Sequence, residues 1–321
     1  MTCEPYAVSV VIPAYNNDAS LAGAVASALG QSVAPAEVIV VDDGSTDGTA
    51  DVARSFTDRV RLIQQNNAGS AIARNTGIAA ATARWVAFLD ADDAWRCDHL
   101  ERCGSVLDGD PTLAWCCGAY MRQLRDGRQR PGGSPTWHRR GAARCGAVGF
   151  FDAWLAGAPI QTSGMVVRRD VFDAVGMFDP DMRRGQDRDM WYRIALAHPR
   201  MGFSWPPTVR YAYNEHSVTA RRGDATAHML PWLSKTAARL AGVDASTRIA
   251  FEPVVRQLAG EILWHSLNVA RPDCLRWLLA EHRDLLSTSQ RAIAWCGART
   301  PAPMLRGLSR IRGRTMTRRD N

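Results

Sequence analysis

The stretch Trp85-Val86-Ala87-Phe88-Leu89-Asp90-Ala91-Asp92-Asp93 decides the fold class of this chain. Its apolar first half predicts a strand buried on both faces, and that strand ends in three carboxylates. In an open α/β sheet, ligands bind just outside the carboxyl ends of such strands. Carboxylates this close repel one another unless a cation or a proton lies among them, and Mg²⁺ shared with substrate phosphates is a natural occupant. The alternative is an acidic turn whose first aspartate caps the next helix.

The part of the chain before this stretch repeats the same pattern of a buried strand, a polar turn and a helix. Strands are predicted at 8–12, 37–41 and 60–64. The helices that follow them are predicted from a cap at Asp18 or Ser20 to Leu29, at 49–56, and in an Ala-rich stretch that contains 74–77. Strand alternating with helix predicts a mostly parallel sheet flanked by helices. Polar residues from several turns therefore gather at one edge of the sheet.

The rest of the chain is predicted in less regular pieces. Strands are expected at 112–120, 163–167 and 208–213, and helices at 95–107, 150–156, 170–175 and 187–197. The segment 122–145 is rich in Gly, Pro and Arg and is expected to be a long loop, either a mobile surface loop or a lid over an anionic substrate. From about residue 225 onward the apolar spacing is helical. We expect three parts: a main domain at 1–222, a helical extension at 223–305 and a basic, fraying tail at 306–321.

Composition narrows the classes of function. The chain has 321 residues, of which 46% are hydrophobic and 22% charged, as in globular proteins. It contains no apolar run of roughly 18–20 residues and does not begin like a signal peptide, so a cytoplasmic location is expected. Its eight cysteines lack zinc spacing and are expected to be reduced.

The net charge of +7 is carried almost wholly by arginine, since Lys235 is the only lysine. Arginine suits phosphate, diphosphate and anionic lipid head groups. No nucleic-acid-binding motif accompanies the charge, so a nucleic-acid partner is not expected. The run from Arg306 to Arg319 either frays in solvent or contacts an anionic membrane at its inner face.

The order of the motifs resembles glycosyltransferase family 2, the inverting transferases with the GT-A fold. The matching segments span about residues 6–220 and lie at 8–16, 40–47, 67–77, 89–93 and 176–193. The resemblance implies a Rossmann-like, mostly parallel sheet flanked by helices, here with a C-terminal helical extension. A nicotinamide dehydrogenase would instead need Gly-x-Gly-x-x-Gly where Pro13-Ala14-Tyr15 stands.

The resemblance also implies a nucleotide-diphospho-sugar donor, most often a uridine one in this family. It places the donor against Pro13, Ala14, Tyr15, Asp42, Asp43, Arg74, Asp90, Ala91 and Asp92. Tyr15 offers a flat face for stacking, and the carboxylate of Asp43 can accept a base N–H. Two roles stay open: Arg74 approaches the nucleotide or is a surface helix arginine, and Asp42 touches the ligand or caps its turn.

Mg²⁺ or Mn²⁺ bridging the diphosphate is the cofactor that the resemblance implies. Asp92 is the expected metal ligand, with Asp93 as a second ligand. His216 lies near the position where related enzymes add a metal ligand, although a lone histidine is more often structural.

Asp187 occupies the position of the family's general base, which takes the proton of the acceptor hydroxyl as that hydroxyl attacks the anomeric carbon. Asp189 is the alternative base, and Asp187 can also act as a helix N-cap. Gln186 stands where the family usually has Glu. The Q-x-x-R-W element of polymerising members is absent, so a synthase that extrudes a long polymer is not expected. The resemblance implies a glycan or a lipid-linked molecule as the acceptor. The alternative function is an inactive nucleotide-sugar-binding or scaffold protein of the same fold.

Overall fold

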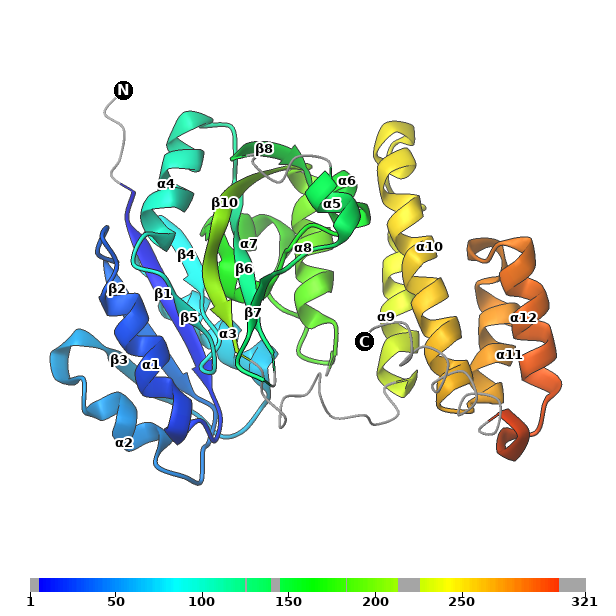
Figure 1. Ribbon diagram of the computed structural model, residues 1–321, viewed down its shortest axis with the longest axis horizontal. Coiled ribbons are helices and arrows are strands. Elements are labelled where there is room, and N and C mark those ends of the chain that lie inside the picture. Colours follow the sequence, from blue (N-terminus) through cyan, green and yellow to red (C-terminus); the bar gives the residue numbers. More distant parts are fainter. Residues whose placement is uncertain (1–5, 125, 140–144, 183, 213–225, 306–321) are drawn as a thin grey trace. The chain divides into compact units, whose positions relative to one another are not determined.

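The computed structural model describes residues 6–124, 126–139, 145–182, 184–212 and 226–305 (Figure 1). The chain divides into two compact units, residues 1–221 and 222–321. The first unit is built around one sheet, and the described part of the second unit is helical. His216 and the run from Arg306 to Arg319 lie outside the described residues.

The first half of the sheet is wholly parallel. Its strands are β1 (Val8–Ala14), β2 (Glu37–Asp42), β3 (Arg61–Gln64) and β4 (Trp85–Phe88), in the spatial order β3-β2-β1-β4. All but β3 are buried along almost their whole length, as expected of strands covered by helices on both faces. The α/β fold predicted from the sequence is confirmed.

The second half of the sheet is mixed rather than parallel. The order continues β4-β9-β6-β10-β5, with β9 (Met165–Arg168) antiparallel to both β4 and β6 (Trp115–Gln123). Strand β10 (Arg200–Tyr211) is parallel to β6 and antiparallel to β5 (Ala94–Trp95) and to β8 (Gly146–Gly149). The predicted strand at 208–213 is therefore only the end of a longer one, whose register against β6 shifts between Ser204 and Val209 around two prolines.

Helices cover the two faces of this sheet. Their bounds are α1 (Asp18–Leu29), α2 (Thr49–Arg54), α3 (Ser70–Ala80), α4 (His99–Gly109), α5 (Pro135–Arg139), α6 (Phe150–Leu155), α7 (Val171–Val175) and α8 (Gln186–Ala197), with short 3-10 turns η1 (Thr57–Arg59) and η2 (Thr162–Gly164). Apolar residues of α1 and α4 share a core with alternate residues of β1. On the opposite face α3 lies very close to β1, because a Cβ at Gly77 would stand 2.2 Å from Val11 Cγ1.

The described part of segment 122–145 is not a structureless loop, which corrects the sequence prediction. Strand β7 (Gln129–Pro131) pairs antiparallel with β6, and α5 follows it. Trp137 of α5 is buried and makes an edge-to-face contact with Phe203, with ring centroids 5.1 Å apart. Burial of an aromatic ring anchors this segment to β10.

The described part of the second unit consists of α9 (Thr226–Arg239), α10 (Ala245–Asn268), α11 (Pro272–Glu281), η3 (Arg283–Leu285) and α12 (Thr288–Arg299). Buried apolar residues recur along α10 every three or four positions, as the helical spacing predicted. Among the described residues, no helix combines the length and the apolarity that crossing a membrane requires.

Candidate functional site

The turns after β1 and β2 are joined to each other by hydrogen bonds. Asn16, with a φ of +52°, donates from its backbone N to Ser45 Oγ at 3.0 Å, and its Oδ1 accepts from Thr46 N at 2.9 Å. Pro13 and Ala14 are buried beneath this turn, whereas Tyr15 is 48% exposed. The turn therefore presents an aromatic ring at the carboxyl edge of the sheet, as a base-stacking role requires.

Asp42 caps its own turn. It is buried, and its two carboxylate oxygens accept from Ser45 N at 3.0 Å and from Gln64 Nε2 at 3.2 Å. Of the two roles left open by the sequence, turn capping is the one that these contacts describe.

Asp43 organises the loop that leads into α3. Its Oδ1 accepts from Gln65 Nε2 at 2.7 Å and from Ala68 N at 2.9 Å, and its Oδ2 accepts from Gly69 N at 2.7 Å. A carboxylate oxygen has two lone pairs, so Oδ2 retains capacity for one more donor. Asp43 therefore sets the start of α3 and keeps the capacity for the base contact expected of it.

Arg74 of α3 is buried at 6% exposure, so it is not a surface helix arginine. Its Nη2 donates to Asp90 Oδ1 at 2.7 Å, and its guanidinium lies 5.6 Å from the centre of the Phe178 ring. Its Nε and Nη1 are buried and have no hydrogen-bond partner within the described part of the chain. Leaving buried charged donors unpaired is costly, which indicates that an acceptor other than the described residues completes this group.

The acidic turn after β4 is tied to η2 and to the end of β10. Ser163 Oγ accepts from Asp90 N at 3.1 Å and donates to Asp93 Oδ2 at 2.6 Å, while Asp93 Oδ1 accepts from Ala212 N at 3.0 Å. Burial, followed by the charge of Asp90, raises the pKa of Asp93 to about 8. Asp93 is thus held within the fold, whereas Asp92 of the same turn is only half-buried.

The electrostatics of this turn suit a cation. Burial and then the charges of Asp93, Asp90 and Asp92 raise the pKa of Tyr211 to about 12. Ala91 is buried between the carboxylates. No cluster of three or more metal-ligating side chains occurs in the residues that the structure describes. One or two carboxylates are nevertheless enough for Mg²⁺ when substrate phosphates and water complete its shell.

The first turn of α8 holds the candidate base. Gly185, at a φ of +74°, is the N-cap, and Asp187 follows in the first turn, partly exposed and accepting from Arg188 N at 2.8 Å. Gln186 Nε2 donates to Ser70 Oγ at 3.0 Å, which joins the start of α8 to the start of α3. Asp187 therefore lies beside the helix that carries Arg74.

Asp189 has a different environment. It is 1% exposed and forms an ion pair with Arg193, one turn later in α8, at 2.9 Å. Arg193 also donates to the carbonyl oxygens of residues 175, 176 and 177 at 2.6, 3.1 and 2.8 Å. A buried carboxylate held in this way is ill-placed to take a proton from a substrate, so the geometry favours Asp187 over Asp189.

Asn75 completes this framework, although no role was predicted for it. Its Nδ2 donates to Phe178 O at 2.8 Å, and its Oδ1 accepts from Phe178 N at 2.9 Å. Phe178, whose ring supports Arg74, makes edge-to-face contacts with Phe88 and Trp191. Helices α3 and α8 are thus held in a fixed relation by the 175–178 segment.

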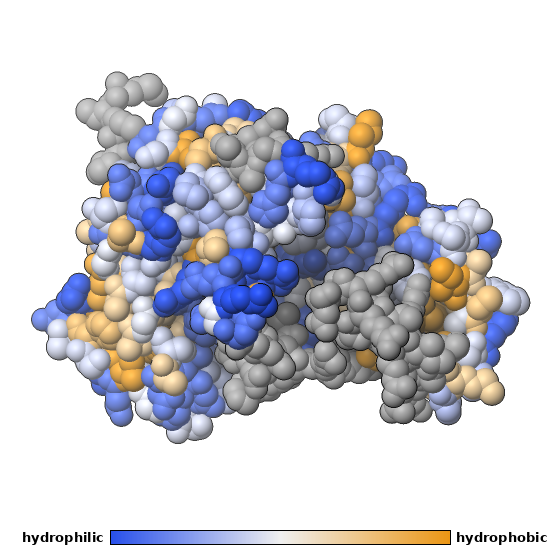
Figure 2. All heavy atoms as spheres, in the orientation of Figure 1, coloured by the Kyte–Doolittle hydropathy of each residue, from blue (hydrophilic) through white to orange (hydrophobic). Residues whose placement is uncertain are grey.

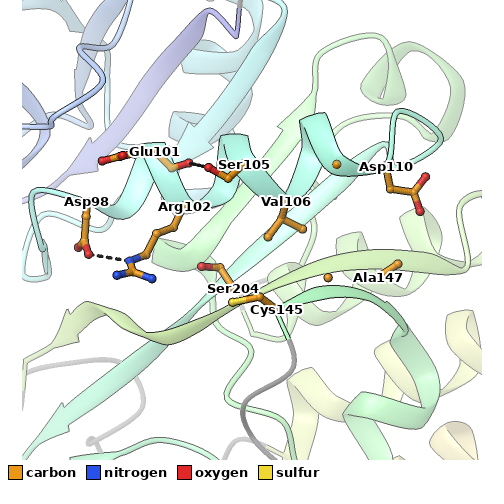
Figure 3. Close-up of a pocket in the computed structure, with 11 residues that line it drawn as sticks. Asp98, Glu101, Arg102, Ser105, Val106, Asp110, Cys145, Ala147 and Ser204 are labelled. Carbon is orange, nitrogen blue, oxygen red and sulfur yellow. Dashed lines mark hydrogen bonds and ion pairs between the residues drawn. The ribbon is translucent and has the colours of Figure 1, made fainter.

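A cavity of about 780 Å³ opens elsewhere on the first unit, between α4 and strands β8 and β10 (Figure 3). Asp98, Arg102, Val106, Cys145 and Ser204 are among its lining residues, and Arg102 Nε is paired with Asp98 at 2.6 Å. None of the site residues predicted from the sequence lines it. We therefore place the candidate site at the acidic turn and not in this cavity.

Polar turns, an exposed aromatic ring and a buried arginine gather near the carboxyl edge of parallel strands, which is where open α/β proteins bind their ligands. Residues 9–176 match the model of glycosyl transferase family 2. The amylovoran biosynthesis glycosyltransferase AmsB of Erwinia amylovora is 31% identical over 283 residues, covering 82% of this chain and 89% of that protein. The chain belongs to glycosyltransferase family 2.

Other curated relatives match over shorter stretches. The UDP-Glc:alpha-D-GlcNAc-diphosphoundecaprenol beta-1,3-glucosyltransferase WfgD of Escherichia coli is 39% identical over 100 residues, which are 30% of this chain and 40% of that protein. The chain spans about half or less of several such relatives, for example 54% of a glycosyltransferase of Nostoc sp..

Solved structures share the fold. TarS 1-349 of S. aureus, in complex with UDP-GlcNAc, superposes with a TM-score of 0.55 at 15% identity, covering 95% of this chain and 91% of that one. The mannosyltransferase PcManGT of Pyrobaculum calidifontis, in complex with GDP-Man and Mn²⁺, gives a TM-score of 0.56 at 21% identity, covering 96% and 85%. The GT-A fold expected from the sequence is confirmed.

Proposed function

We propose that this protein is an inverting glycosyltransferase that moves a sugar from a nucleotide-diphospho-sugar to a hydroxyl of a glycan or lipid-linked acceptor. The observation that carries the proposal is Arg74, whose buried guanidinium is paired with Asp90 on one side only. An anionic nucleotide is the ligand whose oxygens would complete that guanidinium. Tyr15 and Asp43, one turn away along the same edge, supply the stacking face and the acceptor that a base needs.

A uridine donor is the specific form that we favour. WfgD is a UDP-Glc transferase and the TarS complex holds UDP-GlcNAc, whereas the PcManGT complex holds GDP-Man. Asp92 is the residue that would hold Mg²⁺ or Mn²⁺ against the diphosphate, and the bound cation would stabilise the negative charge of the leaving group. Asp93 contributes through its hydrogen bonds to Ser163 and Ala212, which fix the turn.

Asp187 is the proposed general base. Its carboxylate takes the proton from the acceptor hydroxyl, the hydroxyl oxygen forms a bond to the anomeric carbon, and the bond to the nucleoside diphosphate breaks. One displacement of this kind inverts the anomeric centre. The neutral Gln186 bonded to Ser70 leaves Asp187 without a second carboxylate at the adjacent position.

Titration calorimetry with UDP, with and without Mn²⁺, beside a transfer assay with a panel of nucleotide sugars, tests the proposal. We expect Asp187→Asn to keep UDP affinity and to lose transfer by about 100-fold or more, the size of a general-base contribution. The matched control is Asp173→Asn, an exposed aspartate in the first turn of α7, which should leave both unchanged. Near wild-type transfer by Asp187→Asn would place the base elsewhere, and UDP binding without any turnover would favour a scaffold function.

A further inference from the structure

Strand β6 and the short strand β7 that returns along it place two arginines side by side. Arg122 lies directly opposite Arg130 in the antiparallel pairing of these strands, and both side chains are exposed. Residues opposed in this way point to the same face with Cβ atoms about 4.5–5.5 Å apart, so two like charges there destabilise the pair. Among the described residues, neither arginine forms an ion pair, whereas Arg128 of the same hairpin is paired with Asp126 at 2.7 Å.

Two tyrosines hold Arg122 in place. Its guanidinium lies 5.9 Å from the ring centre of Tyr120 and 5.9 Å from that of Tyr211, its partner in the parallel pairing of β6 with β10. The Tyr120 ring in turn lies over Gly132, where a Cβ would stand 2.4 Å from it, so β7 approaches only because residue 132 has no side chain. We call Tyr120, Arg122, Arg130 and Tyr211 the arginine row. Figure 2 shows strongly hydrophilic side chains at the surface where Figure 1 places β7.

The arginine row lies at the same edge of the sheet as the candidate site. Strand β6 runs parallel to β10, and it also runs parallel to β4 because β9 is antiparallel to both β4 and β6. Ala212, the residue after Tyr211, donates to Asp93 of the acidic turn at 3.0 Å. In the order of the strands, β4 and its acidic turn stand between β1 and β6. The row therefore follows the acidic turn, whereas Tyr15 and Asp43, proposed to hold the donor base, precede it.

Two guanidinium groups on one face suit a phosphate better than a carboxylate. A carboxylate offers one edge of two oxygens, which a single guanidinium satisfies. A phosphate monoester or a diphosphate carries more oxygens and close to two negative charges, enough for two guanidinium groups. Such an anion between Arg122 and Arg130 would also remove the repulsion between them.

We propose that the arginine row binds a phosphate or diphosphate group of the acceptor, so that the acceptor of this enzyme is a phosphate-bearing molecule. The inference rests on the proposed function, because it assigns the anion to the second substrate of the transfer. A lipid-linked sugar diphosphate and a polyol-phosphate chain share this chemistry. Either one, held by the row, would have its remaining part at the edge of the sheet that carries the acidic turn.

The test is titration calorimetry of the full chain with inorganic pyrophosphate at low salt, without metal and with UDP saturating the donor site. Arg122→Gln and Arg130→Gln should each weaken pyrophosphate binding by about 10-fold, the size of one lost charge-assisted bond, and leave UDP affinity unchanged. The matched control is Arg128→Gln, which removes the same charge from the same hairpin but a guanidinium already paired with Asp126. It should bind pyrophosphate like wild type.

Two further probes distinguish the sources of the phosphate. Binding of geranyl diphosphate more tightly than glycerol 3-phosphate supports a lipid-linked diphosphate, and the reverse order supports a polyol phosphate. Glucuronate bound more tightly than either would overturn the proposal, because it would assign the row to a carboxylate.

Thermal melting establishes that the three variants are folded. Pyrophosphate affinity that is unchanged in Arg122→Gln would overturn the proposal, and so would an equal loss in Arg128→Gln, which would show a diffuse effect of charge. A fall in UDP affinity in Arg122→Gln would also overturn it, by assigning the row to the donor. Failure of the proposed function would appear in a different measurement, as absence of UDP binding by the wild-type protein.

Discussion

Replacing Arg74 by methionine should separate ligand binding from stability. In the protein without ligand, Arg74 makes one charge-assisted bond, to Asp90, and leaves Nε and Nη1 buried and without a partner in the described residues. Arg74→Met removes the bond but also removes the two unpaired donors. The methionine side chain would fill much of the space of the arginine side chain with apolar atoms, which pack well against the Phe178 ring.

The two effects on stability nearly cancel. The lost bond is worth about 1.5–3 kcal/mol, and Asp90, whose side chain is 30% exposed, can replace it with water. Each buried unpaired donor costs about 1–3 kcal/mol, and both costs disappear. We therefore expect the free energy of unfolding of Arg74→Met to stay within about 2 kcal/mol of wild type. Affinity for UDP should fall by about 10- to 150-fold for each bond that the guanidinium makes to the ligand.

Urea unfolding gives the first quantity and titration calorimetry with UDP gives the second. The control is Arg128→Met, which breaks a surface ion pair to Asp126 of similar length, 2.7 Å, with side chains 80% and 49% exposed. That variant should match wild type in both measurements. A loss of more than about 4 kcal/mol in Arg74→Met would show that the arginine is a structural ion pair. Unchanged UDP affinity would show that it does not contact the nucleotide.

Three further outcomes are expected. Asp92→Asn should abolish the gain in UDP affinity that Mn²⁺ provides while leaving metal-free affinity unchanged; calorimetry with and without Mn²⁺ checks this, and a persisting Mn²⁺ gain contradicts it. The pKa of Asp93 is about 8 in the folded protein, against an ordinary value of 3.8. Between these two values the folded protein keeps a proton on Asp93 that the unfolded chain loses. The contribution of Asp93 to stability is therefore full below about pH 4 and is lost as pH rises towards 8. In the presence of a chelator, the free energy of unfolding measured with urea should therefore decline over that pH window, and the decline should be smaller in Asp93→Asn than in wild type. Parallel pH profiles of the two proteins would refute this prediction. Arg193→Met should lower the free energy of unfolding by about 3–5 kcal/mol because the buried Asp189 loses its ion pair with Arg193. Adding Asp189→Asn should restore part of the loss, and additive losses would mean that the two residues are not coupled.

The parallel half of the sheet was predictable because its strands and helices follow one another along the chain. Each strand from β1 to β4 is a local apolar run followed by a polar turn, and the predicted ends of each strand lie within a residue or two of the observed ends. The edge strands β5, β7 and β8 were not predicted, since they are two to four residues long and form only by pairing with distant segments. Strand β10 was cut short because Pro206 and Pro207 lie within it, where a continuous ladder is not expected.

The candidate site was predictable in its residue types and less so in their roles. The acidic turn after β4 was evident from the sequence. The different environment of Asp93 was not, because its hydrogen bonds come from Ser163, 70 residues away, and from Ala212 at the end of β10. Asp187 and Asp189 look alike in the sequence; the arginine one turn after Asp189 decides which of them is buried. The i, i+4 spacing of Asp189 and Arg193 was a local signal of their ion pair that the sequence offered. The Asn75–Phe178 contact spans 103 residues, so no local pattern could predict it.

Gly77 matters for attempts to change the donor specificity of this protein. It lies one turn beyond Arg74, and because it has no side chain, α3 rests directly on Val11 of β1. A methyl group there would clash with Val11, so the helix that carries Arg74 or the Val11 side chain would have to shift. Under the proposed function, libraries aimed at new donors should therefore keep residues 11 and 77 fixed and vary residues exposed at the carboxyl edge of the sheet, such as Tyr15.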